Sequence, residues 1–408
     1  MGKPKIRFKG YEDDWEQRKF SEFVKNVAVR NREGLELECY AVTNDRGFIS
    51  QKDAHDDFGY MVDVDTTAYN IVPPNSFAYN PARINVGSIG YYAGTENVIV
   101  SSLYEVFQTA DYVDDRFLWH WFKSEHFPKW IERLQEGSVR LYFYYDKLIQ
   151  CEIKMPSLEE QMKIGAYFNH LDHLITLHQR KCEETKSLKK YMLQKMFPEN
   201  GKCVPEIRFS GFSDDWEQRK LSEIAIEKLS NGIMNNQAND ETGLRHINVI
   251  NMYDPDKIHP EKLTFSNYDE DAVKKCNVEW GDIFLTRSSL KPEGIAESNV
   301  LLDSGRFVYD DHLIRLKLDK EKYDPFFVKL NLSGSIFKRQ FIARAKTTAF
   351  TTIGQEDIAE CFGLFPEKEE QEKIGTYFSN LDHLITLHQH KCDELQKLKK
   401  FMLQNMFV

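Results

Sequence analysis

The chain has 408 residues, of which 41% are hydrophobic and 29% are charged, and its formal net charge is −10 at pH 7. These totals are typical of a soluble globular protein with two or more domains, and no stretch approaches the roughly eighteen apolar residues that a membrane helix needs. The seven scattered cysteines include no C-x-x-C pair, and the first ten residues have no apolar signal core, which favours a reducing cytoplasm and argues against a zinc site.

In chain order, the first recognisable segment is a repeated head. Residues 4–23 read PKIRFKGYEDDWEQRKFSEF and return at residues 205–224 as PEIRFSGFSDDWEQRKLSEI, with 14 of 20 positions identical. A tail at residues 159–197 returns at residues 369–407 with 28 of 39 identical, whereas the bodies between head and tail are barely alike. The chain therefore reads as head, body and tail, repeated once. We interpret the frame as performing a shared mechanical task; a recent duplication with fast-changing loops is the alternative.

The first body is mixed in pattern. Residues 97–107 alternate as a strand does, whereas residues 114–135 have helical periodicity. Residues 66–95 contain no acid and are rich in Asn and Tyr. Because Asn and Arg can make bidentate contacts with adenine and guanine edges, this stretch suggests DNA contact, although it also suits protein or sugar recognition. The candidate DNA-binding residues of the first body are Tyr79, Asn80, Arg83, Asn85, Tyr91, Ser138 and Arg140.

A possible nuclease site near the end of the first body needs an alternative interpretation. Asp146 is followed by Glu152 and Lys154, a spacing that a nuclease could use. At the repeat offset of 210 residues, however, Glu152 and Lys154 correspond to Phe362 and Leu364. We therefore predict a strand here that enters the following proline turn.

The tails are predicted to be long helices. Their apolar residues follow alternating steps of four and three, which is a heptad seam, and about 39 residues make a rod of roughly 60 Å. We expect the two helices to pair antiparallel, with a body at each end, and a wider apolar face that includes Leu188 and Tyr191 to contact a further partner. The predicted packing residues are Ile164, Phe168, Leu171, Ile175, Met192, Ile374, Phe378, Leu381, Ile385 and Met402.

Histidines in the tails raise the question of a metal. His178 and His388 lie in the seam, where a histidine is more often a register device than a ligand. His173 and His383 have no Glu or second His at zincin spacing. We predict no metal site.

The second body contains strand-like runs at residues 282–287 and 312–318 and a helical pattern at residues 324–345. Residues 325–355 contain no acid and combine Lys and Arg with a run of Thr, a composition that suits phosphate contacts. The candidate DNA-binding residues of the second body are Arg287, Ser288, Lys291, Lys338, Arg339, Arg344, Lys346, Thr347 and Thr348.

The chain is therefore predicted to be a mixed α+β protein, in which two α/β domains are joined by two long antiparallel coiled-coil helices in an internal repeat with approximate twofold symmetry. The predicted domains are residues 1–157 and 199–367, and the predicted helices are residues 158–198 and 368–408.

Several stretches together resemble one known family. The tail reads MPSLEEQMKIGAYFNHLDHLITLHQ at residues 155–179 and FPEKEEQEKIGTYFSNLDHLITLHQ at residues 365–389, and in both a proline-led EQ-x-K-I turn opens a long helix carrying LD. WGDIFLTRSS at residues 280–289 and the head DDWEQRKLSEI at residues 214–224 extend this pattern. Over essentially its whole length, the chain resembles the specificity (S) subunits of type I restriction-modification systems.

This resemblance implies that each body is a target recognition domain that reads one half of a split, asymmetric sequence in double-stranded DNA. The tail helices would form a rigid spacer and a docking surface for two methyltransferase (M) subunits. Those subunits would carry S-adenosylmethionine and methylate adenine, and restriction (R) subunits would add cleavage that depends on ATP and Mg²⁺. The chain itself is expected to hold no cofactor and to catalyse nothing.

The motifs of the chain favour this non-catalytic interpretation. The string Asn80-Pro81-Ala82-Arg83 lacks the second proline and the aromatic residue of an adenine methylase motif, and no G-x-x-x-x-G-K-[ST] is present for ATP. A scaffold that binds only proteins is the alternative, and it would require the basic stretch at residues 325–355 to be inert. The salt dependence of DNA binding distinguishes the two.

Overall fold

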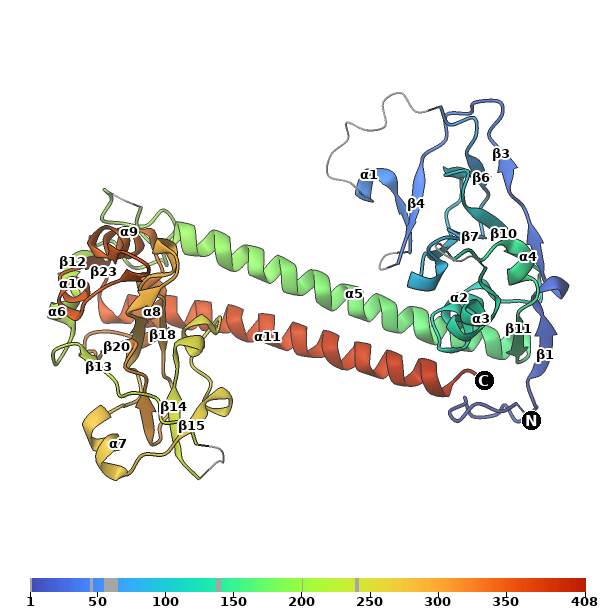
Figure 1. Cartoon of the computed structure of the whole chain (residues 1–408). Helices are drawn as coiled ribbons and strands as arrows, with labels where there is room; N and C mark the ends of the chain where they lie inside the picture. The colour runs from blue at the N-terminus through green and yellow to red at the C-terminus, as the bar shows by residue number, and fades with distance from the viewer. Residues whose placement is uncertain (1, 45–46, 55–64, 137–140, 200, 239–241) are drawn as a thin grey trace. The chain divides into compact units, whose positions relative to one another are not determined.

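The two long helices predicted from the tails are present as α5 (Leu158–Lys195) and α11 (Lys368–Asn405) in the computed structural model, which describes residues 2–44, 47–54, 65–136, 141–199, 201–238 and 242–408 (Figure 1). The chain divides into two compact units. Unit 1 comprises residues 1–178 and 390–408, and unit 2 comprises residues 179–389. Each unit therefore contains one body and a part of both helices.

Within each unit the helices pack antiparallel. In unit 1, the ring of Phe168 stacks on that of Phe407 with centroids 5.7 Å apart, and Asp172 pairs with Lys399. Residue numbers thus fall along α11 as they rise along α5. In unit 2, Lys189 Nζ of α5 lies 2.5 Å from Asp382 Oδ1 of α11, and the two helices are antiparallel there as well. In the described part of the chain, none of the helices combines the length and apolar character of a membrane span.

These two ion pairs explain polar residues in the seam. Lys189 with Asp382 and Lys399 with Asp172 are the same pair at the 210-residue offset, with the roles of the helices exchanged. The aspartates belong to the repeated stretch LDHLITLHQ at residues 171–179 and 381–389. Each copy of the repeated stretch therefore contributes an aspartate that forms an ion pair with a lysine of the other helix.

The predicted packing residues lie where the two helices and the domains meet. Seven of them are buried, namely Ile164, Phe168, Leu171, Ile175, Ile374, Phe378 and Leu381. The remaining three, Met192, Ile385 and Met402, are half-buried. The buried residues of α5 and α11 are continuous with the aromatic cores of the domains, so that each helix is anchored by the same apolar cluster that stabilises its domain.

The heads attach the bodies to the helices through buried ion pairs. Arg7 donates two hydrogen bonds of 2.8 Å to Glu160, and Arg208 donates two of 2.7 Å to Glu370. The glutamate side chains are 1% and 0% exposed. A fork-to-fork arginine–carboxylate pair fixes orientation as well as distance. The head therefore sets the angle at which each helix leaves its domain.

The glutamine of the EQ motif has a separate structural task. Gln161 Nε2 donates to the carbonyl of Pro156, and its Oε1 accepts from the amide of Asp114. Gln371 makes the same contacts with Pro366 and Asp324 in unit 2. These bonds satisfy backbone groups that would otherwise be unpaired where the strand, the proline turn and two helices meet.

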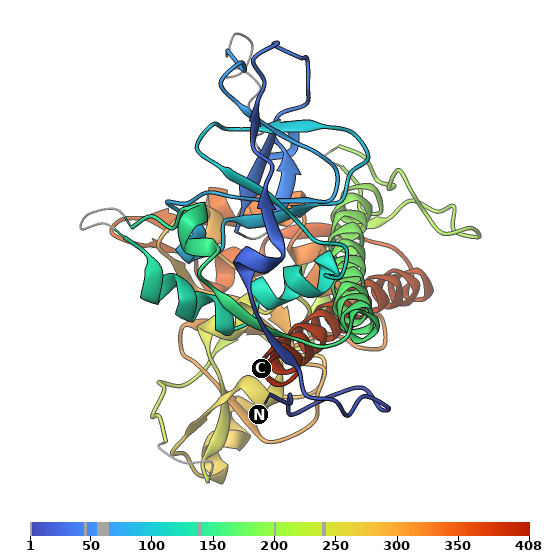
Figure 2. The same cartoon turned by 90° about the vertical axis from the view of Figure 1, so that its right-hand side faces the viewer.

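The end of each long helix contacts the head found in the same unit. The amide of Ile6 donates to the carbonyl of Asn405, and the amide of Ile207 donates to the carbonyl of Lys195, both at 2.9 Å. The first of these bonds brings the two ends of the chain close together, as both views show (Figures 1 and 2).

Two glycines allow the domains to approach the helices closely. A Cβ atom on Gly165 would lie 2.6 Å from Asp114 Oδ1, and one on Gly375 would lie 2.6 Å from Asp324 Oδ1. Both carboxylates already accept hydrogen bonds from backbone amides at the start of a domain helix. A larger residue would therefore displace a helix cap.

The first body is built from strands and short helices. The strands are β1 (Glu16–Lys19), β2 (Val24–Asn26), β3 (Val29–Arg30), β4 (Tyr40–Thr43), β5 (Gly47–Ser50), β6 (Asn70–Val72), β7 (Ser76–Tyr79), β8 (Ile89–Tyr92), β9 (Val98–Val100), β10 (Glu105–Thr109) and β11 (Glu152–Met155). The helices are α1 (Gln51–Ala54), α2 (Asp115–Phe122), α3 (His126–Leu134) and α4 (Tyr145–Leu148).

The second body follows a related plan. Its strands are β12 (Glu217–Lys220), β13 (Ser230–Asn231), β14 (Leu244–Ile247), β15 (Thr264–Ser266), β16 (Ile283–Thr286), β17 (Ser288–Ser289), β18 (Ser298–Val300), β19 (Phe307–Tyr309), β20 (Leu313–Leu316), β21 (Lys346–Thr347), β22 (Thr351–Thr352) and β23 (Phe362–Phe365). The helices are α6 (Leu221–Ile224), α7 (Glu270–Cys276), α8 (Pro325–Leu332), α9 (Ser335–Arg344) and α10 (Gln355–Ala359).

Equivalent four-stranded antiparallel sheets underlie the two dissimilar bodies. The strand order is β2-β10-β7-β8 in unit 1 and β13-β20-β16-β18 in unit 2. In both, a strand of the head pairs with the strand that precedes the long helix, β1 with β11 and β12 with β23. The two bodies therefore share these sheets, although their sequences are barely alike.

Some predicted elements differ from those observed. The single helical patterns at residues 114–135 and 324–345 are each two helices, with breaks at Lys123–Glu125 and Ser333–Gly334. The first break is stabilised by Ser124, whose hydroxyl donates to the carbonyl of Trp121. The strand predicted at residues 97–107 is divided into β9 and β10 by a turn. Strand β11 confirms that Glu152 and Lys154 belong to a strand.

Candidate nucleic-acid interface

The candidate DNA-binding residues of the two bodies follow equivalent strands. The loop after β7 carries Asn80, Arg83 and Asn85, and the loop after β16 carries Arg287 and Lys291. Because β7 and β16 are the third strands of sheets with the same order, these loops leave the two domains at the same point. The sequence singled them out separately, and the fold makes them counterparts.

One further segment closes each loop in the same way. The amide of Phe143 donates to the carbonyl of Pro81 at 3.1 Å, and the amide of Ile353 donates to the carbonyl of Arg287 at 3.0 Å. Phe143 and Ile353 are again 210 residues apart. The segment that precedes α4 in unit 1, and α10 in unit 2, is therefore the second component of the surface.

In unit 2, strand pairing joins the two candidate groups of the second body. Strands β17, β22 and β21 form a three-stranded sheet with β22 in the middle. Thr352 of β22 pairs with Ser288 of β17 on one side and with Lys346 of β21 on the other. The segments that contain Arg287 and Lys346 are 59 residues apart in sequence, so their proximity could not be predicted. We call the combined set the basic hairpin surface; it comprises Arg287, Ser288, Lys291, Lys346, Thr347 and Thr348, all exposed except Ser288, which is half-buried.

Three other candidates of the second body lie on α9. Lys338 is half-buried and forms an ion pair with Glu297, so its charge is already matched within the protein. Arg339 and Arg344 are exposed, and each donates a hydrogen bond to a backbone carbonyl. Lys338 is therefore a weaker candidate for a phosphate contact than the two arginines.

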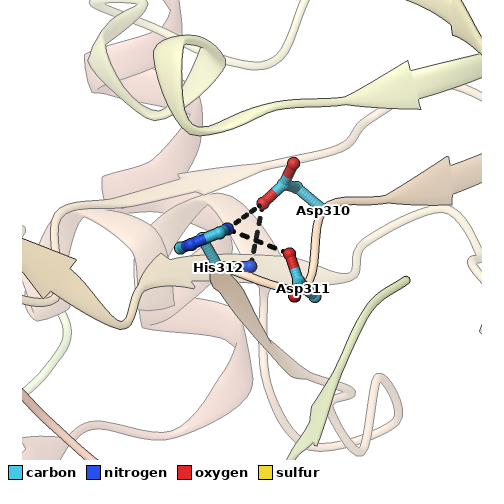
Figure 3. Close-up of side chains that lie close together, drawn as sticks. All are labelled: Asp310, Asp311 and His312. Carbon is cyan, nitrogen blue, oxygen red and sulfur yellow. Dashed lines mark hydrogen bonds and ion pairs between the residues drawn. The ribbon is translucent and has the colours of Figure 1, made fainter. Parts of the chain in front are cut away.

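The turn before β20 positions Arg287. The amide of Arg287 donates to the carbonyl of His312 at 2.9 Å, and its guanidinium donates to the carbonyl of Asp311 at 3.5 Å. Figure 3 shows that both neighbouring carboxylates, those of Asp310 and Asp311, face the His312 ring, whose Nδ1 lies 2.9 Å from each. The turn thus holds the base of the loop while the end of the arginine remains exposed.

The same turn has the composition of a cation site, since ligand atoms of Asp310, Asp311 and His312 all lie within 4.8 Å of one another. Its geometry has an internal explanation. Burial alone would raise the pKa of Asp310, but the His246 ring, 3.8 Å away, and hydrogen bonds from the backbone and ring of His312 lower this pKa to about 2. We therefore assign the cluster a structural role.

In unit 1, the equivalent surface is a groove of about 780 Å³ lined by Asn80, Arg83, Arg30, Tyr142 and Tyr144. The two tyrosine rings stack with centroids 5.5 Å apart and an interplanar angle of 3°. Arg30 and both tyrosines were missed from the sequence. Arg30 lies outside the acid-free stretch at residues 66–95, and a buried Phe between the two tyrosines hides their common face.

The remaining candidates of the first body behave differently. Tyr79 is fully buried in the core, so its ring is not available to DNA, and we omit it. Tyr91 is half-buried and donates to Asn75 Oδ1 at 3.0 Å. Ser138 and Arg140 lie outside the described residues. At the 210-residue offset they correspond to Thr348 and Phe350.

Comparison with known proteins decides what kind of domain this is. The family described as "Type I restriction modification DNA specificity domain" matches residues 12–187 and again residues 213–397. The chain belongs to this family. Each match begins in a head, crosses a body and ends within a long helix, so each repeat is one specificity domain. With two such domains, the chain has the DNA-recognition role of the family and contains two target recognition domains.

Individual relatives are distant but similar in length. The type I restriction enzyme MjaVIII specificity subunit of Methanocaldococcus jannaschii is 23% identical over 401 residues, which cover 95% of this chain and 91% of that protein. The solved structure of the type I restriction-modification system S subunit from M. genitalium has a TM-score of 0.60 at 13% identity and covers 100% of this chain and 99% of that one. At this identity the likeness establishes the fold alone.

Proposed function

We propose that the chain selects the DNA sequence for a type I restriction-modification complex and is itself non-catalytic. Each specificity domain reads one half of a split, asymmetric target, the first through the groove around Arg83 and the second through the basic hairpin surface. The observation that carries this proposal is the equivalent position of the two candidate loops, each closed by a backbone hydrogen bond at the same repeat position.

The partners follow from the same proposal. The chain assembles with two M subunits and with R subunits, and these hold S-adenosylmethionine, ATP and Mg²⁺, whereas the chain itself needs no cofactor. The helix pair sets the number of unread base pairs between the half-sites, because a paired coiled coil is stiff. Since its DNA target and its ATP-dependent partners are cytoplasmic, the chain acts in the cytoplasm.

We infer that the M subunits bind exposed apolar side chains of the two long helices. In unit 2, Leu188 and Tyr191 of α5 are 44% and 50% exposed, and Leu384 and Leu387 of α11 are 41% and 50% exposed. Each lies one residue before a seam position. In an antiparallel pair whose seams face each other, residues one position before the seam lie on the same side of both helices. These four side chains therefore form one apolar patch.

The patch recurs in unit 1. At the 210-residue offset, Leu398 and Phe401 replace Leu188 and Tyr191, and they are 41% and 52% exposed. Leu174 and Leu177, both half-buried, complete the set. Exposed apolar patches of this kind mark protein interaction sites. Two equivalent patches on one chain match a stoichiometry of two M subunits.

The test is a double substitution, Leu188→Glu with Leu398→Glu, co-expressed with the M subunits. We expect the variant to fold, because both side chains are solvent-exposed, but to lose co-purification with the M subunits. The wild-type complex is expected to bind a duplex that contains its target. The logarithm of its binding constant should fall linearly with log[salt], with a slope of about −0.9 for each phosphate contacted.

The matched control is Lys186→Glu with Lys397→Glu, which places the same charge at exposed positions of α5 and α11 outside the patches. This control should retain the M subunits. Equal loss of the M subunits in both double variants would remove the patch from the proposal. DNA binding by the wild-type complex that did not depend on salt would contradict the proposed reading of DNA by this chain.

A further inference from the structure

The basic hairpin surface carries two large apolar side chains that the proposed phosphate and base contacts do not use. Leu290 is 81% exposed, and Phe350 is 54% exposed. Exposing such groups to water is unfavourable, and neither lies in the apolar patches of the long helices. An exposed leucine alone would need no explanation, but these two residues occupy related positions.

Strand register places Leu290 and Phe350 beside each other. In the antiparallel pair β17·β22, Ser289 lies opposite Thr351. Leu290 follows Ser289 and Phe350 precedes Thr351, so the two residues leave the sheet at the same end. Side chains opposite each other across antiparallel strands have Cβ atoms about 5 Å apart. Continued by one residue past the ends of β17 and β22, this register brings the pair together as a single apolar edge.

The alternation of the strands directs this edge away from the protein. Thr351 is 1% exposed and points into the domain, whereas Thr352 is exposed. Since successive side chains point to opposite faces, Phe350 shares the outer face with Thr352 and with Lys346, which lies opposite Thr352.

Hydrogen bonds fix the hairpin that presents Phe350. The amide of Thr348 donates to the carbonyl of Phe350 at 3.0 Å, and the hydroxyls of Thr347 and Thr351 lie 3.1 Å apart. The edge is thus held on a closed turn. Residues 346–355 contain no acid, and the exposed cations Arg287, Lys291 and Lys346 belong to the same surface. A polyanion is the occupant that fits this charge.

We propose that Leu290 and Phe350 form a wedge that enters between adjacent base pairs of the bound duplex and unstacks them. Apolar side chains flanked by Arg and Lys act in this way in proteins that kink DNA. The second domain would then recognise its half-site partly through the ease with which one base step opens, in addition to direct contacts. This inference rests on the proposed DNA-reading function of the same surface.

The test uses the assembled complex and duplexes in which 2-aminopurine replaces one purine at a time in the target. We expect fluorescence to rise on binding at one step in the half-site read by the second domain. The double variant Leu290→Ala with Phe350→Ala should abolish this rise and weaken specific binding by roughly tenfold, the size of one strong contact. Phe350→Leu, which keeps an apolar wedge, should retain most of both.

The matched control is Ile226→Ala, which truncates an apolar residue that is 59% exposed but lies outside the hairpin. It should retain the fluorescence rise and the affinity. Specific binding by the wild type without any rise in fluorescence would overturn the wedge while leaving DNA reading intact. Absence of specific binding by the wild type would instead overturn the proposed function. Loss of the M subunits in the double alanine variant would show that the edge binds protein.

Discussion

Replacing Arg208 with methionine is expected to lower the free energy of unfolding of the chain by about 3–5 kcal/mol. The reason is that the substitution leaves Glu370 without its partner. Glu370 is 0% exposed and receives two hydrogen bonds of 2.7 Å from the guanidinium. Methionine keeps most of the aliphatic volume but leaves a buried carboxylate without its cation. Urea denaturation, followed by circular dichroism, measures the effect.

The control for this substitution is Arg219→Met. Arg219 also forms an ion pair with a glutamate, Glu217, but the two side chains are 44% and 69% exposed. An exposed pair contributes at most about 1 kcal/mol, because water screens both charges. If the two variants were destabilised equally, the head would not orient the helix through its buried ion pair.

The double substitution Arg287→Ala with Lys346→Ala should weaken DNA binding by the assembled complex at least about thirtyfold, which corresponds to about 1 kcal/mol for each lost contact. The two residues come from separate segments that strands β17, β22 and β21 bring together. Loss of a phosphate contact should also make the salt dependence shallower by about 0.9 in log–log slope, whereas loss of a base contact should not. Fluorescence anisotropy over a range of salt concentrations separates these cases.

Lys338→Ala is the matched control, because Lys338 belongs to the same basic stretch but is paired with Glu297. Its removal should change DNA affinity by no more than a few-fold. A larger effect for Lys338 than for Arg287 and Lys346 together would show that the DNA surface follows α9 and not the hairpin.

The sequence predicted the frame of this protein well, because its signals are local or repeated. Heptad spacing identifies α5 and α11, and the proline before each tail marks where the helix begins. The repeat indicated a common task for the heads and tails. It did not reveal that Arg7 pairs with Glu160, since that contact joins residues 153 positions apart.

The site was less predictable for the same physical reason. Composition singled out the segments that contain Arg287 and Lys346, but only strand pairing joins them into one surface. Composition also selected Tyr79, which the fold buries completely. Composition does not distinguish a tyrosine on the inner face of a strand from one on the outer face. Leu290 and Phe350 gave no signal at all, since exposure is a property of the fold.

The most direct test of DNA reading by this chain is modified-base sequencing of cells that express the M subunits with and without it. The account predicts methylated adenines in a single split motif, two short half-sites around a fixed gap, and their loss when the chain is absent. An unchanged methylation map, with the M subunits shown to be expressed, would contradict it.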